Sequence, residues 1–305
     1  KTDPQYNKVT EYNLTDLTTI LYRLSRAWWG SKNEEAKVMF IEVMKWAMDQ
    51  GFFIGSCMGG NDHYGYEIRN AFIASLWMKE PLREAGILDD VAKTIAYWSG
   101  LPETRQPYEL ERGELADSWN TLLVGRLCAA LLYETDAEQL RALRSLYRWI
   151  GQSLCITPGT IGGIKPDFSG FHHGGHYPAY SVPGYASVGE VIGFGYDTQF
   201  EICQEGKEVF KEALMAVGRY SNQVDWGIGL CGRHPLNPTN QISAKAQLAF
   251  AHLARAFTPV DRELASEFLR INQNTNSPFI KEFTDMGVVK SSPSGFFPYN
   301  WSCFG

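Results

Sequence analysis

Apolar side chains recur at three- and four-residue steps along most of this chain, and almost no segment alternates apolar with polar residues. In residues 15–29 the steps place Leu17, Leu21, Leu24 and Trp28 on one side, which is the pattern of an amphipathic α-helix. A β-fold requires alternation with a period of two. The pattern therefore predicts an all-α protein.

The helices have recognisable ends. Asn33 is a predicted N-cap before Glu34 and Glu35, whose charges suit the positive end of a helix dipole, and Gly51 ends that helix. Further helices are expected up to Trp77 and at residues 89–98, 114–133, 136–154, 187–192, 205–220, 243–257 and 261–272. Short connections between such helices favour helical hairpins. No repeat of fixed period is present, which argues against a regular solenoid.

One long connection, residues 162–180, cannot belong to a helix because five glycines and two prolines interrupt it. It nevertheless contains three of the six histidines and four aromatic residues. Long loops are usually functional or disordered, and disordered segments are poor in aromatic residues. We therefore expect an ordered active-site loop.

Composition sets limits on the class of protein. The net charge of −6 argues against a nucleic-acid partner, and no apolar run approaches the roughly 18 residues of a membrane helix. The first residues are no signal peptide, although a signal could have been removed or the sequence could be part of a longer one. The six cysteines are scattered without metal-site spacing, so buried thiols are the expected reading.

Three loops, at residues 59–66, 162–180 and 226–237, lie between predicted helices and hold most of the chemically active side chains. These are Asn61, Asp62, His63, Lys165, His172, His173, His176, Tyr177, Tyr180, Arg233 and His234. No obvious pair of carboxylates accompanies them, which argues against a glycosidase. The histidines lack the helical spacing of a zinc protease, so no metal site is predicted from them.

Histidine, tyrosine and arginine together suit the removal of a proton α to a carboxylate. Cationic or hydrogen-bonding donors stabilise the charge that develops on the carboxylate. Ionising a free tyrosine at pH 7 costs about 4 kcal/mol, given its ordinary pKa near 10. A neighbouring arginine or histidine lowers that cost.

Two of these loops resemble motifs of a known family. The runs Gly163–Asp167 and His173–Ser181 resemble the catalytic loop of chondroitin ABC lyases in polysaccharide lyase family eight. Gly232–Asn237 is similar to that family's arginine loop, and Gly295–Gly305 to the junction with its central β-sandwich domain. Either loop motif alone is only suggestive, but the two together are specific.

The resemblance implies an (α/α) toroid, an incomplete barrel of helical hairpins, over residues 1–290. Residues 291–305 are then the start of a linker into a β-sandwich domain of a larger, multidomain enzyme. The family implies a secreted or periplasmic bacterial lyase that cleaves chondroitin sulfate and dermatan sulfate by β-elimination at the uronic acid. A lyase for hyaluronan, alginate or another uronate polymer stays open, as does a non-catalytic glycosaminoglycan-binding domain.

The family's catalytic roles fall on matching positions. His173 resembles the histidine that assists at C5, Tyr180 the general base and acid, and Arg233 the group that neutralises the uronate. His63 departs from the asparagine motif of relatives specific for glucuronate, and is expected to serve as a second base for iduronate. The family's catalytic glutamate is expected from the β-sandwich domain.

The remaining polar groups of these loops are expected to bind substrate: Asn61, Lys165, His172, His176, His234 and Asn237. The expected partners are a sulfated glycosaminoglycan and the β-sandwich domains of the same chain, with no nucleic acid and no membrane. No cofactor is evident, although a divalent cation, Ca²⁺ or Mg²⁺, stays open. Trp28, Trp29, Trp98 and Trp119 are candidate sugar-stacking platforms, with core packing as the alternative.

Overall fold

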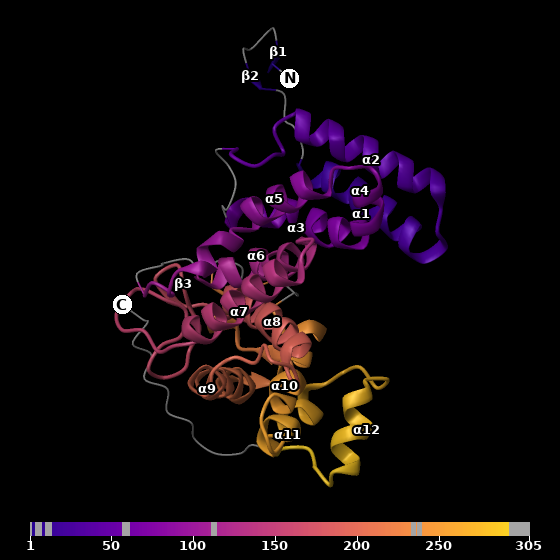
Figure 1. The fold of residues 1–305 in the computed structure, drawn as a ribbon. Coiled ribbons are helices and arrows are strands. Elements are labelled where there is room, and N and C mark those ends of the chain that lie inside the picture. The colour runs from indigo at the N-terminus through magenta and orange to yellow at the C-terminus, as the bar shows by residue number, and fades with distance from the viewer. Residues whose placement is uncertain are drawn as a thin grey trace. The chain divides into compact units, whose positions relative to one another are not determined.

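The computed structural model describes residues 2–3, 8–9, 14–56, 62–110, 115–232, 236 and 240–292, and this part of the chain is built almost entirely of helices (Figure 1). The α-helices are α1 (Leu14–Ser31), α2 (Glu34–Asp49), α3 (Asp62–Trp77), α4 (Lys79–Glu84), α5 (Leu88–Ser99), α6 (Leu115–Leu132), α7 (Asp136–Ser153), α8 (Pro178–Gly195), α9 (Gln204–Tyr220), α10 (Ala244–Arg255), α11 (Arg262–Ile271) and α12 (Pro278–Asp285). The predicted all-α class is confirmed. None of the described helices is long and apolar enough to cross a membrane.

In the described part of the chain, the strands are six two-residue segments that pair as three antiparallel hairpins. They are β1 (Thr2–Asp3) with β2 (Lys8–Val9), β3 (Phe171–His172) with β4 (Gly175–His176), and β5 (Ser221–Asn222) with β6 (Asp225–Trp226). Two 3₁₀ turns, Leu101–Arg105 and Ile228–Leu230, complete the described elements.

Most predicted helix ends agree with the structure within two residues, and Asn33 caps α2 by accepting a hydrogen bond from the Ala36 amide at 2.9 Å. The predicted start of α8 is wrong. That helix begins at Pro178 instead of residue 187, so Tyr180 lies in its first turn and not in a loop. Proline suits this position because the first helical residue has no intrahelical partner for its N–H. The short helices α4 and α12 were also missed.

The described chain divides into two compact units, whose boundaries fall within the 3₁₀ turn Leu101–Arg105, within α6 and within α7. The first unit comprises residues 1–102 and 125–141, and the second comprises residues 103–124 and 142–305. The predicted limits of the toroid at residue 290 and of the linker beyond it stay predictions, and residues 293–305 lie outside the described part.

In the first unit α1 lies beside both α2 and α3 (Figure 1). The Thr18 hydroxyl donates to the Glu67 carbonyl at 2.6 Å, near the start of α3, and the Tyr22 ring lies 5.4 Å from that of Trp77, at its end. Helices α1 and α3 therefore run in the same direction, and α2 packs on α1. Leu21, Phe40 and Phe72 are buried in this layer.

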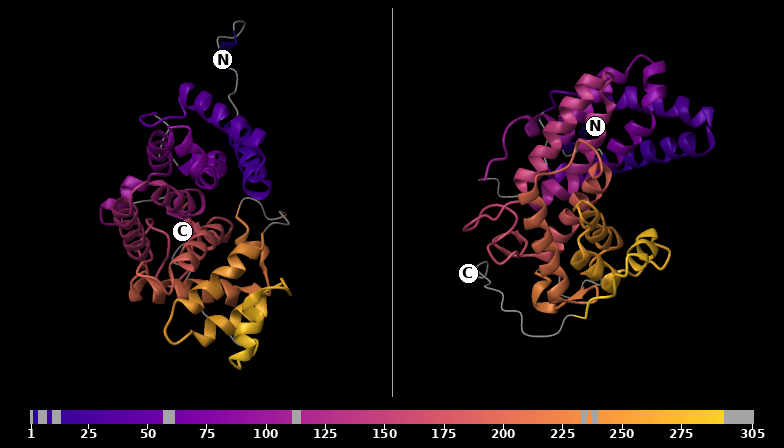
Figure 2. Two further views of the ribbon diagram at one scale, coloured as in Figure 1. Left: turned by 45° about the vertical axis from the view of Figure 1, so that its right-hand side comes forward. Right: turned by 60° about the horizontal axis from the view of Figure 1, so that its bottom comes forward.

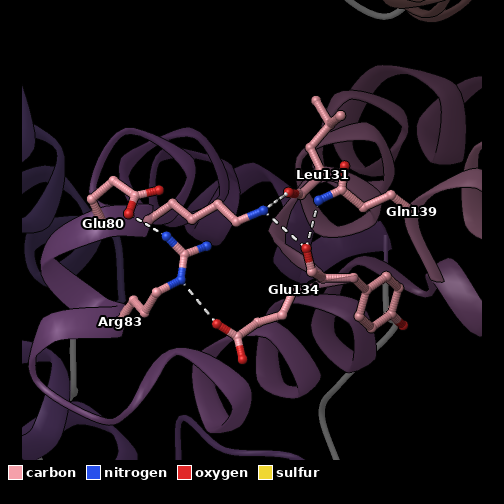
Figure 3. A network of polar contacts seen from close by, with 7 residues as sticks. Glu80, Arg83, Leu131, Glu134 and Gln139 are labelled. Atoms are coloured by element: carbon pink, nitrogen blue, oxygen red, sulfur yellow. Dashed lines mark hydrogen bonds and ion pairs between the residues drawn. The ribbon is translucent and has the colours of Figure 1, made fainter. Parts of the chain in front are cut away.

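A polar network joins α4 to the end of α6 in the first unit (Figure 3). The Lys79 ammonium donates to the carbonyls of Leu131 at 2.6 Å and Tyr133 at 2.9 Å. These carbonyls belong to the C-terminal end of a helix, where the dipole favours a cation. Burial lowers the pKa of Lys79, and Arg83 acts in the same direction. Arg83 itself pairs with Glu134 at 2.9 Å and with Glu80.

In the second unit α8 packs closely on α10. A β-carbon added to Gly189 would lie 2.3 Å from the β-carbon of Ala249, so the two backbones approach more closely than larger residues allow. Helices α10, α11 and α12 follow one another at the C-terminal end of this unit, in orange to yellow in Figure 2. Phe268 of α11 contacts Phe283 of α12 with ring centroids 5.8 Å apart.

Candidate active site

Residues 154–177 of the second unit form an ordered loop that folds on itself through backbone pairing. Ile164 bridges both Ile156 and Gly170, and the Phe171 amide donates to the Gly163 carbonyl at 2.9 Å. A further bond, from the Tyr177 amide to the Gly170 carbonyl at 2.9 Å, closes the loop onto α8. The loop is ordered, as predicted, although the β3–β4 hairpin within it was not foreseen.

His173 lies at the turn of the β3–β4 hairpin. His173 and Gly174 have φ values of 49° and 84°, and a two-residue turn of the common type I′ requires a positive φ at both central positions. Histidine is among the few non-glycine residues enriched in this conformation. The turn leaves His173 exposed, while His172 and His176 on the two strands are buried.

The rings of this hairpin gather around Tyr180. Its ring stacks on that of His172 with centroids 4.2 Å apart and an interplanar angle of 25°. The His173 ring meets it nearly edge-on at 4.9 Å, and the Tyr177 ring also lies at 4.9 Å. Tyr180 is partly exposed. The structure therefore brings the predicted base and the predicted assisting histidine together at the surface of one unit.

A buried carboxylate lies beneath this cluster. Oδ2 of Asp117, in the first turn of α6, is 3.4 Å from Nε2 of His172, and both side chains are almost completely buried. Such a pair carries opposite charges only while the imidazole is protonated. Asp117 was not among the predicted site residues. The sequence did hold a sign of this buried carboxylate, because Asp117 stands between Ala116 and the buried Trp119 on an apolar helix, where a charged residue is unusual.

Lys165 and His176 are interior residues of the loop. The Lys165 side chain is 1% exposed, and its ammonium group contacts the Ile161 carbonyl and lies 4.1 Å from the centroid of the Phe171 ring. Burial lowers the pKa of His176 to about 4, against an opposing effect of Asp167. These contacts hold the loop together, and substrate binding by either residue stays a prediction.

The segment before Arg233 reaches the same cluster. Gly232 has φ 56°, and a β-carbon there would lie 2.3 Å from the Tyr177 ring. This backbone therefore rests directly on Tyr177, which contacts Tyr180 and His173. Of the predicted residues, Asn61, Arg233, His234 and Asn237 lie outside the described part of the chain.

The other predicted residues fall elsewhere. His63 is exposed at the start of α3, which belongs to the first unit. Trp98 and Trp119 are buried, at 2% and 0% exposure, so both pack in the core and are not sugar platforms. Cys128 and Cys231 are buried as predicted, but Cys203 is exposed.

Within the described residues, no three or more of His, Cys, Asp and Glu gather as a metal ion would require. The possible divalent cation stays a prediction, because anionic polysaccharides also bring oxygen ligands of their own.

Comparison with known proteins gives the family. A family model described as "Lyase, catalytic" matches residues 1–278, and this chain belongs to that family of lyase catalytic domains. It is 29% identical over 301 residues to a chondroitin sulfate ABC endolyase of Proteus vulgaris, covering 96% of this chain. It is 31% identical over 275 residues to a chondroitin sulfate ABC exolyase of Bacteroides thetaiotaomicron, covering 87%. The chain resembles chondroitin ABC lyases, as its loop motifs predicted.

The likeness extends to a solved structure. The fold matches a xanthan lyase of Paenibacillus with a TM-score of 0.61 over 96% of this chain, at 15% identity. This agrees with the predicted fold class, the all-α toroid of lyase catalytic domains. The chain spans 29% of the Proteus endolyase, 26% of the Bacteroides exolyase and 30% of the xanthan lyase chain.

Proposed function

We propose that this chain is the helical catalytic part of a polysaccharide lyase that cleaves chondroitin sulfate and dermatan sulfate by β-elimination. The observation that supports this most strongly is the contact of the exposed His173 with the partly exposed Tyr180, at 4.9 Å between ring centroids. The membership in the lyase family and the similarity to chondroitin ABC lyases support the proposed substrate class.

In the proposed reaction, Tyr180 as tyrosinate removes the proton from C5 of the uronic acid. The C5–H electron pair forms the C4–C5 double bond as the bond from C4 to the glycosidic oxygen breaks. Tyr180 then returns a proton to the departing oxygen. His173 assists at C5, and Arg233 neutralises the carboxylate, which stabilises the negative charge that develops there. Positioned groups of this kind accelerate proton transfer by about 10²–10⁴-fold.

His63 is the proposed second base, which would act on iduronate from the opposite face of the ring. His63→Ala should then lower the rate on dermatan sulfate more than that on chondroitin sulfate. Equal losses on both polymers would remove this role. A secreted or periplasmic location, and a catalytic glutamate supplied by a β-sandwich domain of the same chain, are part of the proposal.

The test is the ultraviolet absorbance of the full-length protein mixed with chondroitin sulfate, and separately with dermatan sulfate. Elimination leaves a double bond conjugated with the carboxylate, which absorbs, whereas hydrolysis leaves none. We expect absorbance to rise on both polymers and to be lost in Tyr180→Phe. Tyr196→Phe, at the other end of α8 and also partly exposed, is the matched control and should keep its activity.

Other outcomes separate the alternatives. Absorbance that rises only with hyaluronan or alginate would give another uronate polymer as substrate. Binding of glycosaminoglycan without turnover by the protein with Tyr180 intact would favour a non-catalytic binding domain. Reducing ends without absorbance would contradict the lyase proposal.

A further inference from the structure

The solvent-facing side of α1 carries aromatic and cationic residues in alternation. Tyr22, Arg26 and Trp29 stand four and three residues apart, a spacing that places side chains on one face of a helix. Lys32 follows directly after the last helical residue. Arg26, Trp29 and Lys32 are exposed, Trp29 at 58%, and Tyr22 is partly exposed. We call Tyr22, Arg26, Trp29 and Lys32 the α1 ladder.

Each cation of the α1 ladder lies next to an aromatic ring. The Arg26 guanidinium carbon is 5.8 Å from the centroid of Tyr22, and Nζ of Lys32 is 5.0 Å from that of Trp29. Lys32 has φ 53°, and its Nζ also lies 4.8 Å from the centroid of the Trp28 ring. These distances are within the roughly 6 Å of a cation–π contact.

The two cations of the α1 ladder can be approached by an external anion. Among the residues that the structure describes, neither Arg26 nor Lys32 pairs with a carboxylate. The neighbouring Lys37, 5.1 Å from the Trp28 ring, differs, because it pairs with Glu84 at 2.8 Å and Glu34 at 3.4 Å. The ladder therefore offers one exposed ring, Trp29, and one partly exposed ring, Tyr22, together with two cations that an external anion can approach.

The α1 ladder lies at the opposite end of its helix layer from His63. Helices α1 and α3 run in the same direction, with Thr18 beside Glu67 and Tyr22 beside Trp77. His63 is one turn before Glu67, whereas Lys32 lies fourteen residues beyond Thr18, about 21 Å at 1.5 Å per residue. A ligand bound at the α1 ladder would therefore lie away from His63 within the first unit.

We propose that the α1 ladder is a second binding site for an anionic polysaccharide, made of residues other than those that carry the proposed reaction. The flat face of the exposed Trp29 ring suits the C–H face of a pyranose ring, and Arg26 and Lys32 suit sulfate and carboxylate groups. From Tyr22 to Lys32 the ladder rises about 15 Å, which several sugar residues can follow. The proposal goes beyond the proposed lyase activity and rests on it only for the choice of polymer.

The same residue types also bind single-stranded nucleic acid, by stacking and charge. The sequence pI of about 5.6 differs from the basic balance typical of nucleic-acid-binding domains. The polysaccharide is therefore the ligand that these observations favour, and nucleic acid is an outcome to be tested.

The experiment measures the affinity of the full-length protein for fluorescently labelled chondroitin sulfate, in a Tyr180→Phe background so that the polymer stays intact. Trp29→Ala and Lys32→Asn are compared with the parent, because asparagine tolerates the left-handed backbone of position 32. Each should weaken binding about two- to tenfold, as expected for loss of one exposed ring or cation contact. The loss on Lys32→Asn should shrink at high salt, where screening is stronger.

Two variants control for unspecific effects. Trp46→Ala removes another indole that is half exposed, on α2. Lys281→Asn makes the same change of charge at an exposed position of α12, where Lys281 pairs with Asp285. Both should bind within about twofold of the parent, and thermal melts should show all four variants folded, since every altered side chain is exposed.

Ladder variants that bind like the parent would overturn the proposal, and so would equal losses in the controls. Losses confined to a labelled oligothymidylate probe, with chondroitin sulfate binding unchanged, would assign the ladder to nucleic acid instead. Failure of the lyase proposal is seen separately, as absence of unsaturated product from the protein with Tyr180 intact, and leaves the binding result unaffected.

Discussion

The Tyr180 cluster of the second unit and the α1 ladder of the first unit use the same kinds of side chain in opposite ways. In the cluster, the ring centroids of His172, His173 and Tyr180 lie 4.1–4.9 Å from one another, where a hairpin turn with positive φ values meets the first turn of α8. In the ladder, two rings stand apart on a regular helix, each next to a cation, with Trp29 exposed and Tyr22 partly exposed.

The difference corresponds to what each region is proposed to do. Proton transfer needs a base and its assisting groups fixed within hydrogen-bond reach of one atom of the substrate. A tight turn, buried supports and glycine contacts provide that fixed geometry at Tyr180. A surface that holds a flexible polymer needs only repeated, individually weak contacts, which one exposed helix face can supply.

The largest expected effect tests the chemistry of the cluster. His173→Asn should lower elimination by about 10²–10⁴-fold, because an assisting group is lost, while the melting temperature stays nearly unchanged since asparagine accepts a positive φ. Steady-state kinetics and a thermal melt measure the two quantities. Turnover within tenfold of the wild type would place the assisting function elsewhere.

The next largest effect is expected at His176, a buried residue of β4. The pKa of His176 is about 4 in the folded chain and near 6.5 in an unfolded one. Between these values the unfolded chain binds the proton and the folded chain does not, so stability should fall as the pH drops from about 6.5 to 4. His176→Gln should remove about 2.5 kcal/mol of the difference in unfolding free energy between pH 7.5 and pH 4.5.

Urea unfolding of the wild type and of His176→Gln at both pH values gives this difference. An identical pH dependence in the two proteins would show that His176 is protonated equally in the folded and unfolded states, contrary to its burial.

Two glycines test whether the backbone is packed more tightly near the Tyr180 cluster than along α1. A β-carbon at Gly170 would lie 2.1 Å from Oγ of Ser181, whereas one at Gly30 of α1 meets nothing within 4 Å. Gly170→Ala should lower the unfolding free energy by about 1–3 kcal/mol through overpacking, and Gly30→Ala should raise it by up to about 1 kcal/mol through helix propensity. Chemical denaturation measures both changes in unfolding free energy. Changes of the same sign in the two variants would contradict the difference in packing between the two positions.

The smallest effect is expected for a variant of the α1 ladder. Arg26→Ala should weaken binding of chondroitin sulfate about two- to fivefold through loss of one exposed cation, with Lys45→Ala of α2 as control, because Lys45 pairs with Glu42. Fluorescence titration in the Tyr180→Phe background gives the ratio. A larger loss in Lys45→Ala than in Arg26→Ala would point to net charge and not to the ladder.

The sequence alone was enough for the all-α class, most helix ends and the lyase family. These follow from local rules, because a helix is specified by apolar spacing and caps within a few residues, as at Asn33. The motifs around His173 and Tyr180 are likewise contiguous runs that can be matched to a family without a structure.

Only the tertiary structure decided which side chains meet. Asp117 lies beside His172 although fifty-five residues separate them, Gly232 rests on Tyr177, and Lys165 turns inward to the loop carbonyls. It also buried Trp98 and Trp119 and left Trp29 in solvent. Periodicity tells which residues share a face, but burial and contact depend on what the rest of the chain places opposite that face.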